Sequence, residues 1–307
     1  IKYREVLEMD REMGRAWYSL GMAYMVTGKK DEALECLIRA VEAGLDYAKI
    51  WYQIARLYMD KGDKNNAVKS LRRVIEIDEY FVDAWLMLGR IYMDSGKYEA
   101  AVDCCRKVIE MDSKNFEAWE LLGDIYLASG SYDHALKAYS TALSIRGGDE
   151  KILLKMSDVY IKVGDFDAAI RVIDDILREK PDSLTALARK GKILVQIGRY
   201  DLAVEVCKKA LSLDPDSVDA LYCLGRAYHR KKAYEAAIKY YERVLKIEPN
   251  NVDAIKCMAD AYYASGNAKK AIKLYKMALE LCPDNHVLWY NLGVIYFRQR
   301  RNREAID

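Results

Sequence analysis

The side chains that could perform chemistry are few and scattered. The chain has three histidines and seven cysteines among 307 residues. No Cys-x-x-Cys pair or Cys/His cluster with zinc-ligand spacing is present, and no two histidines lie close enough in sequence to predict a metal site or a catalytic triad. The phosphate-binding patterns GxxxxGK[ST] and GxGxxG are also absent. We therefore expect no catalytic, cofactor-binding or metal-binding residues.

The composition predicts a folded protein that is soluble in water. Hydrophobic residues make up 52% and charged residues 31% of the chain, and the net charge is +2. This balance permits a buried core and argues against general attraction to nucleic acid or to an anionic membrane. We find no signal peptide or membrane-spanning run. Because scattered, unpaired thiols are typical of a reducing compartment, we expect a cytoplasmic protein.

A repeat of 34 residues runs through the chain. Alanine recurs at this step at Ala33, Ala67, Ala101, Ala135, Ala169, Ala203, Ala237, Ala271 and Ala305. A tyrosine series, a series of small residues, a series of large apolar residues and all four prolines keep the same frame. Such self-similarity at a fixed period is the signature of a repeat architecture.

Each repeat predicts two helices. Trp17, Leu20, Gly21 and Tyr24 are spaced i, i+3, i+4, i+7, which places them on one face of a helix. Gly28 follows as a turn residue that tolerates positive φ and ends this helix. The alanine series lies on the apolar face of a second helix. Small residues at Gly21 and at the alanine position would let the two antiparallel helices approach closely.

This pattern resembles the tetratricopeptide repeat, whose signature is W-x2-L-G-x2-Y, then A-x3-F, then P over 34 residues. Trp85, Leu88, Gly89, Tyr92 and Ala101 match it within one repeat. The resemblance implies an all-α fold, a right-handed superhelical solenoid of antiparallel helix pairs. We assign residues 1–13 to the second helix of a truncated preceding repeat, residues 14–285 to eight complete repeats and residues 286–307 to a truncated ninth.

The resemblance also implies a binding surface. In this family the first helices line a concave groove, near the second, fifth, sixth, ninth, twelfth and thirteenth residues of each repeat. In repeats one to three these positions combine soft apolar side chains with two arginines, which we predict to be a peptide groove: Tyr18, Met22, Met25, Tyr52, Arg56, Met59, Arg90 and Met93. Two alternatives are that the methionines belong to the core, and that Asp60 and Asp94 pair with the arginines.

A secondary basic surface is predicted in repeats six and seven. It comprises Arg189, Lys192, Arg226, His229 and Arg230. A known variant of the family clamps a C-terminal carboxylate with lysine and asparagine. No asparagine occupies the ninth position here, so that role is disfavoured.

Three functions compete. The leading hypothesis is a protein–protein interaction scaffold that binds a peptide or partner protein in the concave groove. One alternative is a substrate-recruiting array of a larger enzyme, whose catalytic domain lies outside this sequence; the start at Ile1, without an initiator methionine, suggests a fragment. The other alternative is RNA binding through the basic surface, which the small net charge disfavours. We also expect end-to-end self-association, because Val6 and the residues Trp289, Leu292 and Tyr296 lack part of their cover.

Overall fold

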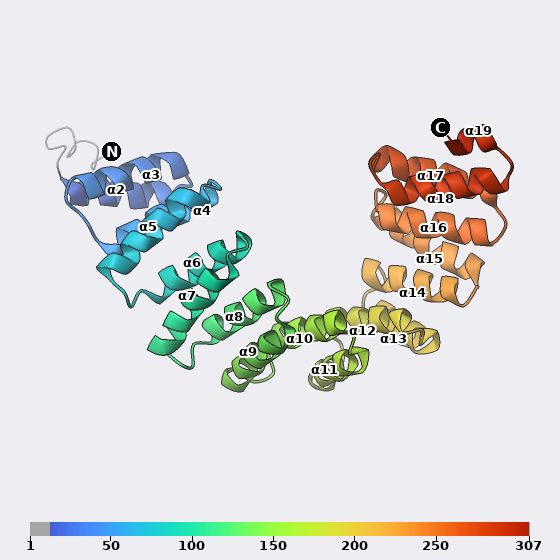
Figure 1. The fold of residues 1–307 in the computed structure, drawn as a ribbon, viewed down its shortest axis with the longest axis horizontal. Coiled ribbons are helices and arrows are strands. Elements are labelled where there is room, and N and C mark those ends of the chain that lie inside the picture. The colour runs from blue at the N-terminus through green and yellow to red at the C-terminus, as the bar shows by residue number, and fades with distance from the viewer. Residues whose placement is uncertain (1–12, 307) are drawn as a thin grey trace. The chain divides into compact units, whose positions relative to one another are not determined.

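The fold is an array of helix pairs. The computed structural model describes residues 13–306, apart from the side chain of Asn302. Within this range it contains 18 α-helices and no strand, as the repeat predicts (Figure 1). The chain divides into two compact units, Ile1–Ile152 and Leu153–Asp307, and the division falls within one helix. Residues 1–12, with the helix predicted there and with Val6, lie outside the described residues.

Unit 1 contains four helix pairs. Their bounds are α2 (Gly14–Val26) with α3 (Lys30–Glu42), α4 (Ala48–Asp60) with α5 (Lys64–Ile77), α6 (Val82–Asp94) with α7 (Tyr98–Met111), and α8 (Phe116–Ala128) with α9 (Tyr132–Ile145). Each helix packs against its partner and against the helix that follows in this unit.

Unit 2 begins within α10 (Glu150–Val163), which is followed by α11 (Phe166–Glu179). The next pairs are α12 (Leu184–Gln196) with α13 (Tyr200–Leu213), α14 (Val218–Arg230) with α15 (Tyr234–Ile247), and α16 (Val252–Ala264) with α17 (Ala268–Leu281). Two last helices, α18 (His286–Arg298) and the short α19 (Asn302–Ile306), complete the described chain. First helices also contact one another directly, α12 with α14 and α14 with α16.

The turn inside each pair lies where the repeat predicts it. Gly28 has φ 76° and Gly198 has φ 81°, in the left-handed region that glycine adopts without steric penalty. At the corresponding position of α14 and α15 the residue is Lys232, which still adopts φ 61°. The fold therefore imposes the turn even where the side chain disfavours it.

The alanine series forms the contact between paired helices. The side chains from Ala33 to Ala271 in this series have 0% exposure. The small residue of the first helix lies against the same helix: a side chain built on Gly21 would meet Leu37 at 3.0 Å and the Ala33 carbonyl oxygen at 3.3 Å. One on Gly123 would overlap the ring of Tyr139. The small residues thus make room for the large side chain in the middle of the second helix, as close packing of interiors requires.

The tryptophans of unit 1 hold the connections between pairs. The indole N–H of Trp85 donates to the Glu79 carbonyl oxygen at 2.8 Å, and that of Trp119 donates to the Ser113 carbonyl oxygen at 3.0 Å. Unit 2 has leucine or isoleucine at the corresponding positions of α12, α14 and α16, all buried: Leu187, Leu221 and Ile255. These side chains pack without tying the preceding connection.

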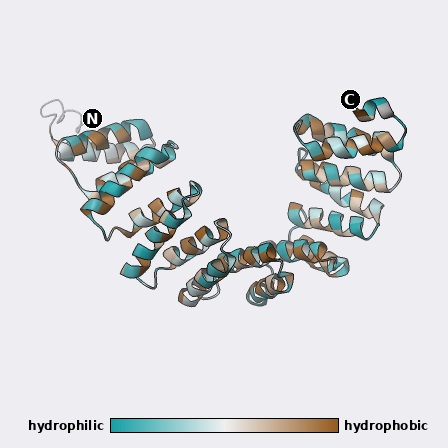
Figure 2. Cartoon of the chain, in the orientation of Figure 1, coloured by the Kyte–Doolittle hydropathy of each residue, from teal (hydrophilic) through white to brown (hydrophobic). Residues whose placement is uncertain are grey.

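Polar and apolar residues share most helices, as Figure 2 shows by the mixing of brown and teal along them. This mixture suits helices that bury one face and expose the other. In the range that the structure describes, no helix has both the length and the apolar character to cross a membrane.

The expected exposed surface at α18 is smaller than predicted. Trp289 is 51% exposed, but Leu292 and Tyr296 are each only 4% exposed. Both belong to a core cluster with Tyr275 and Leu279 of α17. The prediction that Leu292 and Tyr296 lack cover is wrong, because α17 and the residues of α19 pack against them.

Ala169→Leu should destabilise the protein by about 1–3 kcal/mol, the usual effect of overpacking a filled core. Ala169 is 0% exposed in α11, so the extra atoms have no room. Urea denaturation followed by circular dichroism measures the change. Arg171→Leu, at an exposed position of the same helix, is the control. An unchanged midpoint for Ala169→Leu would contradict the tight contact.

Lys232→Gly should stabilise unit 2 by about 1 kcal/mol, because a side chain in the left-handed region costs about 1–2 kcal/mol and glycine does not. The reverse change at the equivalent turn, Gly198→Lys, should destabilise by a similar amount. Thermal melts of both variants against the wild type test the pair. Two shifts of the same sign would refute the explanation.

Candidate cavity of helices α12, α14 and α16

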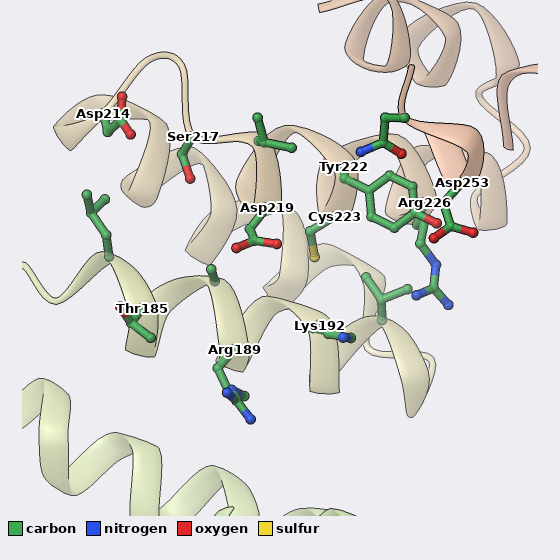
Figure 3. A pocket seen from close by; sticks show the side chains of 15 residues that line it. Thr185, Arg189, Lys192, Asp214, Ser217, Asp219, Tyr222, Cys223, Arg226 and Asp253 are labelled. Atoms are coloured by element: carbon green, nitrogen blue, oxygen red, sulfur yellow. The ribbon is translucent and has the colours of Figure 1, made fainter. Parts of the chain in front are cut away.

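The groove positions of three consecutive first helices enclose a cavity of about 580 Å³. Its lining includes second, fifth, sixth and ninth residues of the repeats, positions that the sequence resemblance implied, together with residues of the connections such as Asp214, Ser217 and Asn251. Figure 3 shows Arg189 and Lys192 on α12, Tyr222 and Arg226 on α14, and Asp253 on α16. The volume lies within the range of about 300–1,000 Å³ that ligand pockets occupy.

The basic side of the cavity contains three residues from the predicted basic surface. Arg189 forms an ion pair with Asp158 of α10, and the carboxylate offsets the positive charge of the guanidinium. Lys192 is exposed and Arg226 is half-buried. Neither makes a hydrogen bond or ion pair among residues 13–306, so both have donors available to a ligand.

The acidic side of the cavity was not predicted. Asp219 and Asp253 are exposed, and neither forms an ion pair within the described part of the chain. They occupy the second position of repeats seven and eight, while Lys192 and Arg226 occupy the ninth position of the repeats before. The cavity therefore presents unpaired charges of both signs.

Tyr222 lies among these charges. Its ring is half-buried and tilted against Tyr241, with 6.0 Å between ring centroids, and its hydroxyl lies 3.4 Å from the Cys257 Sγ. Burial, followed by the charge relations with Cys257 and Asp253, raises the pKa of Tyr222, while Arg226 acts in the opposite direction. The hydroxyl therefore stays protonated at neutral pH and can donate or accept a hydrogen bond.

Arg226 lies at a repeat position where two other repeats have an aspartate that accepts a structural hydrogen bond. In α9 the Tyr139 hydroxyl donates to the Asp124 Oδ1 at 2.6 Å, and in α17 the Tyr275 hydroxyl donates to Asp260. Both aspartates are the ninth residue of their repeats.

Repeat seven has the tyrosine, Tyr241, but its ninth residue is Arg226. The Tyr241 hydroxyl is buried and makes no well-formed hydrogen bond in the described structure; its neighbour, the Cys257 thiol, is at most a weak partner. An unsatisfied buried polar group costs about 1–3 kcal/mol. Repeat seven therefore lacks the hydrogen bond that repeats four and eight have, at the point where it places a cation in the cavity.

The remaining residues of the predicted basic surface do not line the cavity. His229 is half-buried against the edge of Tyr234, with 5.6 Å between centroids, and burial lowers its pKa. Arg230 is exposed at the end of α14. The structure thus brings Arg189, Lys192 and Arg226 together and separates the other two.

The predicted groove of repeats one to three divides by residue type. Tyr18, Met25, Tyr52, Met59 and Met93 are half-buried and pack against core clusters, and Met22 is half-buried as well. The alternative that the methionines are core residues is therefore partly correct. Arg56 and Arg90 are exposed.

The alternative pairing of these arginines is wrong. Asp60 forms an ion pair with Lys30 at 2.6 Å, and Asp94 forms one with Lys64 at 3.3 Å. Each lysine lies at or near the start of a second helix, close to the turn of the adjacent repeat. Arg56 donates to the Gln53 Oε1 at 3.2 Å, and the structure gives it no carboxylate partner within residues 13–306.

Metal and thiol chemistry find no support in this geometry. Over residues 13–306, no three or more His, Cys, Asp or Glu side chains are grouped to hold a metal ion. The cysteines are free; five are buried, Cys257 is half-buried and Cys282 is exposed. Burial raises the pKa of Cys104 and Cys105 to about 12, which keeps these thiols protonated and unreactive.

Family models match almost the whole chain. One described as the tetratricopeptide repeat protein 21 C-terminal ARM domain matches residues 22–186, more than half of the sequence. Others, described as tetratricopeptide or TPR repeats, match residues 2–35, 191–232, 218–251 and 259–299. The chain belongs to the tetratricopeptide repeat family. Proteins of this family are typically non-catalytic scaffolds, and membership supports a general role in protein interaction.

Several solved structures are similar to this chain, and the first named here has the same fold. A tetratricopeptide repeat protein from Parabacteroides merdae ATCC 43184 is 17% identical with a TM-score of 0.63, over 85% of this chain and 99% of that one. MamA is 26% identical with a TM-score of 0.47, over 55% of this chain and 92% of its own. YrrB, described as a TPR protein with an unusual peptide-binding site, is 18% identical with a TM-score of 0.46, over 60% and 95%. No curated protein matches the sequence.

Tyr→Phe substitutions in this tetratricopeptide array test whether the tyrosine hydroxyl stabilises repeat four, which has the aspartate acceptor, but not repeat seven, which lacks it. Tyr139→Phe should destabilise by about 1–3 kcal/mol, because it removes a hydrogen bond to a charged group. Tyr241→Phe should be neutral or stabilising by about 1–3 kcal/mol, because it removes an unsatisfied hydroxyl. Arg226→Asp, which restores the acceptor, should also stabilise. Urea denaturation of the three variants measures these differences, and equal losses for the two phenylalanine variants would contradict the assignment.

Proposed function

We propose that this protein is an interaction scaffold that holds a segment of a partner protein in the cavity of α12, α14 and α16. The observation that carries the proposal is the exchange at Arg226. Repeat seven leaves Tyr241 without its acceptor and presents a cation to the cavity instead. Unfavourable local arrangements of this kind cluster at functional sites.

A polypeptide segment suits the chemistry of the walls. Lys192 and Arg226 can donate to carboxylates or to main-chain carbonyls of a ligand. Asp219 and Asp253 can accept from main-chain N–H groups or from basic side chains. Tyr222 adds contact area at low entropic cost and a hydrogen-bonding tip. A cavity of about 580 Å³ takes a few side chains rather than a folded domain.

RNA fits the cavity less well. Asp214, Asp219 and Asp253 share its lining with the basic residues, and Arg189 is already paired with Asp158. A phosphate backbone would meet these carboxylates as well as the cations. Binding of RNA depends on an excess of positive charge, which this site does not offer.

The groove of repeats one to three is a second candidate within the same function. It is favoured by Arg56 and Arg90, which are exposed while the nearby aspartates pair with lysines instead. The exposed parts of six half-buried side chains would supply apolar contacts: Tyr18, Met22, Met25, Tyr52, Met59 and Met93. The role of substrate recruitment for a larger enzyme stays a prediction, compatible with either groove.

Site-specific crosslinking tests the cavity. A photoreactive benzoylphenylalanine replaces Thr185, which is exposed and lines the cavity, and in a matched protein it replaces Lys239, which is exposed on α15 outside it. We expect a partner to crosslink from position 185 and not from position 239. Lys192→Glu with Arg226→Glu should weaken this binding by about 2 kcal/mol or more, as reversal of anchoring charges commonly does.

The control for charge is Lys239→Glu, which should leave the crosslink unchanged. Circular dichroism establishes that each variant keeps its helices. A crosslink that survives the double reversal, or that forms equally from position 239, would show that the cavity is not the binding site.

A further inference from the structure

The cavity contains a group of three residues that recurs in unit 1. In unit 2 the group is Tyr222, Arg226 and Asp253, at the fifth and ninth positions of one repeat and the second position of the next. Among the complete repeats, only the second shares this combination, as Tyr52, Arg56 and Asp83. The two groups are separated by five repeats, and each lies within one unit.

The two tyrosines have similar surroundings. Both are half-buried against an aromatic ring: Tyr52 lies 5.0 Å from Phe81 and Tyr222 lies 6.0 Å from Tyr241, between ring centroids. Burial is the largest cause of the raised pKa of Tyr52, and Asp83 adds to it while Arg56 and Arg90 oppose it. Tyr222 stands in the same relation to Asp253 and Arg226. The aspartate and the arginine of each group therefore act on the pKa of their tyrosine in the same opposed directions.

The charged members of both groups are available to a ligand. Asp83 is exposed and forms no ion pair in the described part of the chain, as is true of Asp253. Arg56 contacts only the neutral Gln53 through a hydrogen bond, and Arg226 makes none. Opposite charges thus lie at equivalent repeat positions in both units, without an ion pair between them among the described residues.

We infer that the chain has two binding sites for one class of ligand, a peptide segment with an acidic side chain beside an apolar one, and that each chain binds two equivalents. The inference rests on the proposed function for the site in unit 2. In each site the arginine receives the acidic side chain, the tyrosine ring packs on the apolar one, and the aspartate accepts from a main-chain N–H of the segment.

The repeat that follows each site gives the two sites different charges. Its ninth residue is Arg90 in unit 1 and Asp260 in unit 2. Arg90 is exposed, whereas Asp260 accepts the Tyr275 hydroxyl. The site in unit 1 is therefore the more positive, so it favours segments with a second acidic residue. Its affinity falls more steeply with salt, because exposed charges are screened.

The experiment uses a phage-displayed library of random twelve-residue peptides as the probe. Selection is run in parallel on two single variants of the whole chain. Arg226→Glu disables the site in unit 2, and Arg56→Glu disables the site in unit 1. Lys239→Glu and Lys69→Glu, at exposed positions on second helices, are the matched controls. We expect both selections to recover peptides with an acidic residue next to an apolar residue.

A recovered peptide is then synthesised and titrated by calorimetry. We expect two equivalents to bind the wild type and both controls, one to bind each single variant, and affinity at each disabled site to fall about thirtyfold or more. The double variant Arg56→Glu with Arg226→Glu should bind no measurable peptide. Circular dichroism melts verify that every variant is folded.

Other outcomes separate the inference from the proposed function. One equivalent, lost with Arg226→Glu and unaffected by Arg56→Glu, overturns the second site and leaves the proposed function standing. One equivalent that depends only on Arg56 overturns both the cavity proposal and the paired sites. Unrelated motifs from the two selections overturn the shared ligand class, and failure to enrich any peptide overturns both proposals.

Discussion

Close packing between the two helices of each pair, which requires a buried alanine on the second helix and a small residue on the first, determines most of this structure. Alanine at this position is fully buried from Ala33 to Ala271, and Gly21 and Gly123 have no room for a side chain. The contact sets the separation and the rotation of the two helices. Once one face of the first helix is committed to it, the second and ninth residues of the repeat lie to one side of that face and the fifth lies at its edge. Those residues form the cavity of unit 2 and the equivalent surface of unit 1.

Much of the fold could therefore be predicted from the spacing of residues, whereas the site could be predicted only in part: its basic residues in repeats six and seven were, and its acidic residues Asp219 and Asp253 were not. Gly28 and the alanine series predict turns and contacts because backbone conformation and close packing leave few alternatives. The lining positions followed from the family resemblance. The cavity itself depends on which charges find partners. Asp60 and Asp94 bind lysines of neighbouring turns rather than the arginines four residues before them, and sequence spacing within one helix does not reveal such contacts between repeats.

The exchange at Arg226 shows how a single position can serve either stability or recognition. In repeats four and eight the ninth residue is an aspartate that accepts a buried tyrosine hydroxyl. In repeat seven it is an arginine, and the hydroxyl of Tyr241 loses its acceptor. The sequence contains evidence of this exchange, because repeat seven keeps the tyrosine while its ninth residue changes from an acidic to a basic side chain. Its meaning follows only from the structure, which shows that the ninth residue accepts the tyrosine hydroxyl in repeats four and eight. Proteins commonly sacrifice local stability at functional sites in this way.

The distribution of tryptophan gives the molecule an optical asymmetry. Trp17, Trp51, Trp85 and Trp119 all lie in unit 1, and the fifth, Trp289, lies in α18. At the positions in between, unit 2 packs leucine and isoleucine against the same neighbouring helices. Repeats five to eight therefore contain no indole chromophore. Intrinsic fluorescence reports on the first four repeats and on the environment of α18, whereas circular dichroism reports on every helix. If the two signals separate during denaturation, their difference reports on the repeats that lack tryptophan, without any added label.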